Sequence, residues 1–122
     1  MQLGRVQLQI MQVLWDRDRA SAREITDALN ETEPIAHSTV QTLLRKLEAK
    51  GAVSHGVEDR TFLFFPLVKE ENVKRKATRE LLERVFGGSA SDLVAYLLKN
   101  EKLDRDELNA IRRLINDKKR KP

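Results

Sequence analysis

The chain has 122 residues, of which 40% are hydrophobic, and a formal net charge of +4. These values suit one globular domain or two small units and exclude an extensively disordered chain. Without cysteine the chain can form neither a disulfide nor a thiolate metal site, so we expect a cytoplasmic protein. No apolar run reaches the roughly 18 residues of a membrane span, and no membrane insertion is expected.

The positive charge is distributed unevenly. Residues 1–66 hold eight Lys and Arg against nine Asp and Glu, whereas the run Lys118–Lys121 alone contributes four cations. Because only cations that touch phosphate strengthen binding to nucleic acid, the net charge does not locate a nucleic-acid surface. A nucleic-acid surface has to be located from the positions of individual cations within each element.

Two amphipathic helices are predicted at the start of the chain. Apolar residues at helical spacing predict the first over about residues 5–15, with Trp15 in the core. The second begins at Ser21, where Glu24 three positions later can complete a capping box. The helical pattern ends before Pro34, which favours an extended conformation at the preceding residue.

The third predicted helix carries the pattern on which the functional hypothesis depends. Ser38 is expected to cap it, with Gln41 completing the capping box, and Gly51 is expected to end it. One face would bury Val40, Leu43, Leu44 and Leu47. The opposite face offers hydroxyls, an amide and two cations, which suit base edges and phosphates in a DNA groove. The candidate DNA-binding residues of this helix are Ser38, Thr39, Gln41, Thr42, Arg45 and Lys46.

A β-hairpin is predicted to follow the third helix. Residues 52–57 alternate weakly, residues 56–60 are typical of a turn, and Thr61–Phe65 is β-prone and aromatic. Three helices and a hairpin, with a polar face on the third helix, predict a winged helix-turn-helix over residues 1–68. Arg60, in the turn, is a candidate phosphate contact.

Three further helices are predicted within residues 69–117. The first covers about residues 70–86, the second starts at the pair Ser89 and Asp92, and the third starts at a capping box formed by Asp104 and Glu107. They are too short to bury a core of their own, so we expect them to pair with a second copy of the chain as a homodimer. The residues assigned to this dimerisation surface are Val73, Leu81, Val85, Leu93, Leu97, Leu108, Ile111 and Ile115.

The predicted fold class is therefore mainly α with a small β-hairpin: a winged helix-turn-helix followed by a helical dimerisation domain and a basic tail at residues 118–122. The sequence has no G-x-S-x-G, H-E-x-x-H or G-x-G-x-x-G motif, and its two histidines stand alone. We expect no enzymatic activity, no cofactor and no metal. His37, just before the third helix, is either a solvated turn residue or a phosphate contact.

Several groups of residues together form a specific pattern. They are Met11, Val13, Leu14 and Trp15; Arg23, Glu24 and Ile25; the run Ser38–Leu47 with Lys50 and Gly51; Arg60, Phe62, Phe64 and Pro66; and Phe86, Gly88 and Ser89. With this pattern the chain resembles the penicillinase and methicillin-resistance repressors of bacteria, a family that also includes copper-transport repressors. The resemblance covers nearly the whole chain. It implies a homodimeric winged-helix repressor that binds double-stranded, palindromic operator DNA.

Two features of that family are missing from this sequence. Antibiotic-responsive members carry an Asn-Phe pair that a membrane sensor protease cuts, but here no Asn precedes Phe, and the aligned pair is Asp92 and Leu93. Copper-responsive members carry cysteines near the C-terminus, and this chain has none. We therefore expect neither induction through the sensor-protease pathway nor copper sensing through thiolates.

One alternative function stays open at the level of the sequence. Some winged helices dock on proteins through the third helix, and the near-neutral charge of residues 1–66 favours such a protein-interaction adaptor. A salt titration of binding to mixed duplex DNA separates the two functions, because only phosphate contacts release counterions and weaken steeply with salt.

Overall fold

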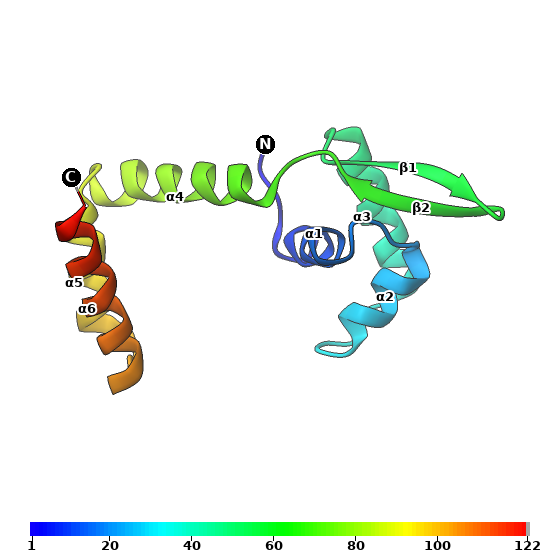
Figure 1. Ribbon diagram of the computed structural model, residues 1–122. Helices are drawn as coiled ribbons and strands as arrows, with labels where there is room; N and C mark the ends of the chain where they lie inside the picture. Colours follow the sequence, from blue (N-terminus) through cyan, green and yellow to red (C-terminus); the bar gives the residue numbers. More distant parts are fainter. Residues whose placement is uncertain (122) are drawn as a thin grey trace. The chain divides into compact units, whose positions relative to one another are not determined.

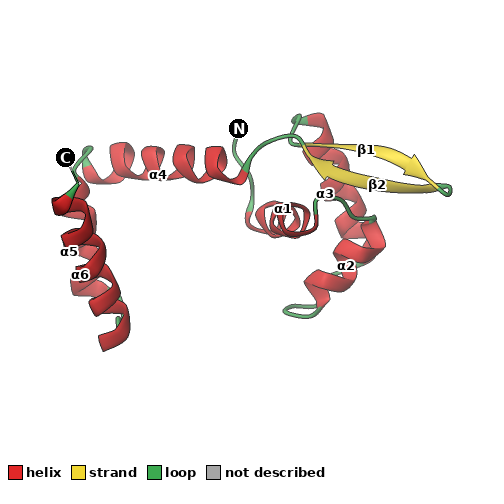
Figure 2. Cartoon of the chain, viewed as in Figure 1, coloured by secondary structure: helices red, strands yellow, loops and turns green. Residues whose placement is uncertain are grey.

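The computed structural model describes residues 1–121, which form six helices and one two-stranded antiparallel sheet (Figures 1 and 2). The helices are α1 (Arg5–Arg17), α2 (Ala22–Asn30), α3 (His37–Ala49), α4 (Glu70–Phe86), α5 (Ala90–Asn100) and α6 (Arg105–Arg120). The strands are β1 (Val53–Glu58) and β2 (Thr61–Pro66). The chain forms two compact units, which divide between Lys76 and Ala77, within α4. The predicted fold class is confirmed, whereas the predicted domain boundary at residue 68 stays a prediction.

The core of the first unit lies where α1, α2 and α3 meet the hairpin. Its largest fully buried side chains are Ile10, Met11, Leu14, Ile25, Val40, Leu44, Leu47 and Val53. Leu43 is partly buried against this cluster. The apolar stripe predicted for α3 is therefore confirmed, and the hairpin projects beyond the three helices of its unit (Figure 2).

The capping box predicted at the start of α2 is confirmed. The Glu24 N–H donates to Ser21 Oγ at 3.1 Å, and the Ser21 N–H donates to Glu24 Oε1 at 2.9 Å. The Ser21 backbone N–H that donates to the carboxylate, and after it the Ser21 side chain, lower the pKa of the Glu24 carboxyl below its ordinary value. The carboxylate also lies at the positive end of the helix dipole.

The predicted start of α3 was wrong by two residues. Ala36 is the N-cap, so Ser38 lies inside the first turn and caps nothing. The turn before α3 is closed from α2 instead, because the Asn30 side chain donates to the Ile35 carbonyl at 3.0 Å and accepts from the Ile35 N–H at 2.9 Å. A side chain that bonds both backbone groups of one turn residue fixes this connection without a local cap.

The end of α3 agrees with the prediction. Gly51 has a φ of 81°, in the left-handed region that favours glycine. Its N–H donates to the Glu48 carbonyl, and the Ala52 N–H donates to the Leu47 carbonyl at 2.9 Å. This pair of hydrogen bonds is a Schellman motif, which satisfies the last carbonyls of the helix and directs the chain into β1.

The hairpin has a shorter turn than the sequence suggested. The strands pair without a break from Val53 opposite Pro66 to Glu58 opposite Thr61, so only Asp59 and Arg60 form the turn. Both have a positive φ, of 51° and 65°. This is the backbone of a type I′ turn, whose twist matches that of the two strands.

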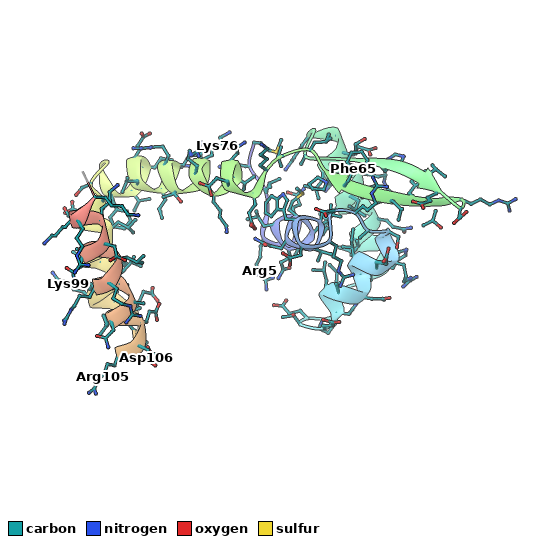
Figure 3. The ribbon with its side chains drawn as sticks, in the orientation of Figure 1. Arg5, Phe65, Lys76, Lys99, Arg105 and Asp106 are labelled. Carbon is teal, nitrogen blue, oxygen red and sulfur yellow. The ribbon has the colours of Figure 1, made fainter. Side chains whose placement is uncertain are left out.

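The N-caps predicted in the second half of the chain, Ser89 and Asp104, are confirmed. Ser89 Oγ accepts from the Asp92 N–H at 3.1 Å, and Asp104 Oδ1 accepts from the Glu107 N–H at 2.8 Å. Figure 3 labels Arg105 and Asp106, which lie in the first turn of α6. The residues Lys118–Arg120, expected in a separate tail, form the last turn of α6.

The second unit buries little of its apolar surface. None of the described side chains of α4, α5 or α6 is fully buried. The rings of Phe86 and Tyr96 meet edge to face with centroids 5.9 Å apart. The large apolar side chains that stay exposed here are Leu81, Val85, Val94, Tyr96, Leu97, Leu98, Leu108, Leu114 and Ile115.

Candidate nucleic-acid interface

The predicted polar face of α3 is exposed along its whole length. All six candidate residues on this helix are solvent-exposed: Ser38, Thr39, Gln41, Thr42, Arg45 and Lys46. The other side of the same helix is anchored by Val40, Leu44 and Leu47, each at most 1% exposed. The first unit therefore holds a rigid helix by one face and presents hydroxyls, an amide and two cations on the other.

Three residues of this face are joined by hydrogen bonds along the helix. The Thr42 hydroxyl donates to the Ser38 carbonyl at 3.0 Å, and Arg45 Nη2 donates to Thr42 Oγ1 at 3.2 Å. The threonine thus orients the guanidinium along the exposed side of α3. Since a guanidinium has five N–H donors, the remaining ones can still form the paired contacts that guanine accepts.

Arg60 lies apart from this group, at the tip of the hairpin. It is exposed, and its left-handed backbone belongs to the type I′ turn. The neighbouring carboxylates of Glu58 and Asp59 oppose its charge in sequence. A cation at the tip of a wing can approach a phosphate that the third helix does not reach.

A contact between α3 and the wing was missed by sequence reasoning. His55 Nδ1, on β1, lies 2.5 Å from Glu48 Oε1 in the last turn of α3. The His55 ring also stacks on Phe62 of β2, with centroids 4.3 Å apart and planes 18° apart. These contacts tie the base of the wing to the helix, and no local pattern in the sequence pairs Glu48 with His55.

His37 was expected either in solvent or on a phosphate, and its ring contacts α2. The Thr26 hydroxyl donates its proton to the Ala22 carbonyl at 2.8 Å. It therefore accepts at 3.0 Å from Nδ1–H of His37. This hydrogen bond fixes the ring at the start of α3 and gives His37 a structural role.

The described residues offer little for other kinds of site. Within residues 1–121, no three His, Asp or Glu side chains gather as metal ligands. Across the same residues, no helix combines the length and apolar content needed to cross a bilayer.

The exposed polar helix, the turn before it and the hairpin after it define a winged helix-turn-helix protein. The helical second unit follows this arrangement in the chain. The chain belongs to the penicillinase repressor family, which it matches over residues 3–117.

Individual relatives agree with that assignment. The chain is 27% identical to the penicillinase repressor of Bacillus licheniformis, over 97% of this chain and 92% of the relative. It is 25% identical to the methicillin resistance regulatory protein MecI of Staphylococcus aureus strain N315, over 96% and 95%.

Two solved structures resemble the N-terminal part of the chain. The DNA-binding domain of the repressor BlaI is 31% identical with a TM-score of 0.53, covering 58% of this chain and 87% of that one. The monomeric form of Bacillus licheniformis BlaI, solved in complex with the blaP half-operator, is 30% identical with a TM-score of 0.52 and covers 59% and 88%.

Proposed function

We propose that this protein is a transcriptional repressor that binds a palindromic DNA operator as a homodimer. The observation that carries the proposal is the exposed polar face of α3, held from behind by three fully buried side chains. A helix presented in this way can enter the major groove, where base edges can be distinguished. The half-operator complex of the related BlaI, at 30% identity, supports the same use of this unit.

Each residue of the interface has a proposed role. Base edges or nearby phosphates are contacted by the hydroxyl and amide groups of Ser38, Thr39, Gln41 and Thr42. Arg45, oriented by Thr42, reads guanine, while Lys46 and the wing residue Arg60 contact phosphate. The proposed DNA-reading domain is residues 1–68.

The homodimer is supported by the apolar surface of the second unit. A monomer would leave its nine exposed large apolar side chains in water, a larger set than scattered surface residues explain. We propose residues 69–117 as the dimerisation domain. Its contact residues are Val73, Leu81, Val85, Leu93, Leu97, Leu108, Ile111 and Ile115. A repressor of this kind acts on cytoplasmic DNA and needs no catalytic activity.

The proposal is tested by the affinity of the full chain for defined duplexes. A palindrome is first selected from a random-sequence library, and binding is then measured by fluorescence anisotropy at several salt concentrations. With the four phosphate contacts that Lys46 and Arg60 supply in a dimer, the affinity should fall roughly a hundredfold between about 50 and 200 mM salt.

Two control duplexes separate operator reading from other behaviour. Shuffling one half-site should remove most of the affinity, because a two-fold dimer reads half-sites about 10 base pairs apart or a multiple of that. Binding that is weak, independent of salt and equal on shuffled DNA would favour the protein-interaction adaptor instead.

A further inference from the structure

A hydrogen bond far from the DNA-reading face holds the connection between β2 and α4. Trp15 Nε1, on α1, donates to the carbonyl oxygen of Val68 at 2.9 Å, across 53 positions of the chain. The side chains of both residues pack against the core of the first unit. The indole N–H therefore bonds the last residues before α4 to the first helix of the chain.

The rest of this connection is equally restrained. The Leu67 N–H donates to the Ala52 carbonyl at 2.8 Å. The Lys69 carbonyl already accepts hydrogen bonds from two N–H groups of α4, at 3.1 and 3.2 Å. Leu67 and Val68 are thus bonded to the winged-helix unit, and Lys69 is bonded to the first turn of α4.

We propose that Trp15 is a positioning residue whose indole N–H fixes where α4 starts on the winged-helix unit and thereby limits the half-site spacing that the dimer accepts. The proposal rests on the proposed function. Its physical basis is that α4 runs without a break past the boundary of the first unit, so a restraint on its first turn passes along the helix. Phe in place of Trp15 would fill part of the same space but has no N–H to donate.

The affinity for a single half-site should not depend on this hydrogen bond, because Trp15 lies on α1 and not on α3. The affinity for a palindrome should depend on this hydrogen bond, since the winged-helix units of both protomers must be oriented at once. A freer start of α4 adds conformations that are lost on binding, and it also lets the dimer reach spacings that the native protein rejects.

Since Trp15 is the only tryptophan in the chain, a tryptophan analogue changes the indole N–H of Trp15 and no other group. Global incorporation of β-(3-benzothienyl)alanine in place of tryptophan replaces the ring N–H by sulfur and keeps the shape of the bicyclic ring. The full chain is then titrated with three duplexes: the selected palindrome, its half-site, and the palindrome with about five extra central base pairs, half a helical turn.

For the sulfur variant we expect unchanged half-site affinity, a loss of roughly tenfold on the palindrome, and a smaller penalty for the inserted base pairs. Trp15→Phe should change the three affinities in the same direction. Ile10→Val is the matched control: it removes a buried methylene from the same unit, should lower its thermal stability, and should leave the spacing preference unchanged.

Wild-type behaviour of the sulfur variant on all three duplexes would overturn the positioning role. An equal loss of affinity for half-site and palindrome would also overturn it, because Trp15 would then contribute only to the stability of the winged-helix unit. If the unmodified protein bound half-site and palindrome equally, the proposed dimeric function would fail first, and there would be no spacing for Trp15 to set.

Discussion

Replacing Arg60 by glycine should stabilise the winged-helix unit while weakening its binding to DNA. Arg60 is the second residue of a type I′ turn, with a φ of 65°. A non-glycine residue in this region costs roughly 1–2 kcal/mol, and glycine gives back about 0.5–1 kcal/mol through its greater freedom in the unfolded chain. The net expectation for Arg60→Gly is a gain of about 0.5–1 kcal/mol.

The two effects are measured separately. Thermal unfolding followed by circular dichroism should show the Tm rising by about 2–6 °C. In the salt titration of palindrome binding, the slope should flatten by about one unit for each protomer, because one phosphate contact per wing is lost.

Arg60→Ala is the matched control, since it removes the cation but keeps a side chain in the left-handed conformation. It should reproduce the change in salt slope without the gain in Tm. A lower Tm for Arg60→Gly would refute the argument from backbone strain, and an unchanged slope would show that the wing does not contact phosphate.

Three further predictions concern other parts of the molecule. Arg45→Ala should cost about 1–3 kcal/mol on the selected palindrome and reduce its preference over shuffled DNA in a competition titration; equal losses on both would exclude base reading. The folded-state pKa of Glu24 is lowered, so its contribution to stability is present above the ordinary pKa of 4.5 and is lost as the pH falls through the lowered value. Urea unfolding should show this acid loss in the native protein and a smaller one in Glu24→Gln, and identical pH profiles would contradict it. Leu97→Asp should convert the homodimer to a monomer in sedimentation equilibrium; a persistent dimer would place α5 outside the interface.

Features set by near neighbours in the chain were predictable from the sequence. The buried stripe of α3 follows from helical spacing, and the caps at Ser21, Ser89 and Asp104 follow from pairs three residues apart. The exposed polar face of α3 is the complement of that stripe. For these features a short window of sequence contains the whole physical cause.

Two features that depend on distant residues were missed, and so was one local turn of unusual sequence. Ser38 looked like a cap, but Asn30 closes the turn from the preceding helix. The hairpin turn was predicted too long, because Asp59 and Arg60 are not the Asn-Gly or Asp-Gly pair that usually marks a two-residue turn. The contact of Trp15 with Val68 joins elements whose proximity only the folded chain establishes.

The absence of fully buried side chains in the described parts of α4, α5 and α6 has a consequence for gene control. If two copies must complete one another's interior, the folded dimer is favoured by mass action. Well below the dimer dissociation constant, operator occupancy would rise with the square of the chain's concentration. Dilution during growth would then release the controlled genes more sharply than a monomeric regulator allows.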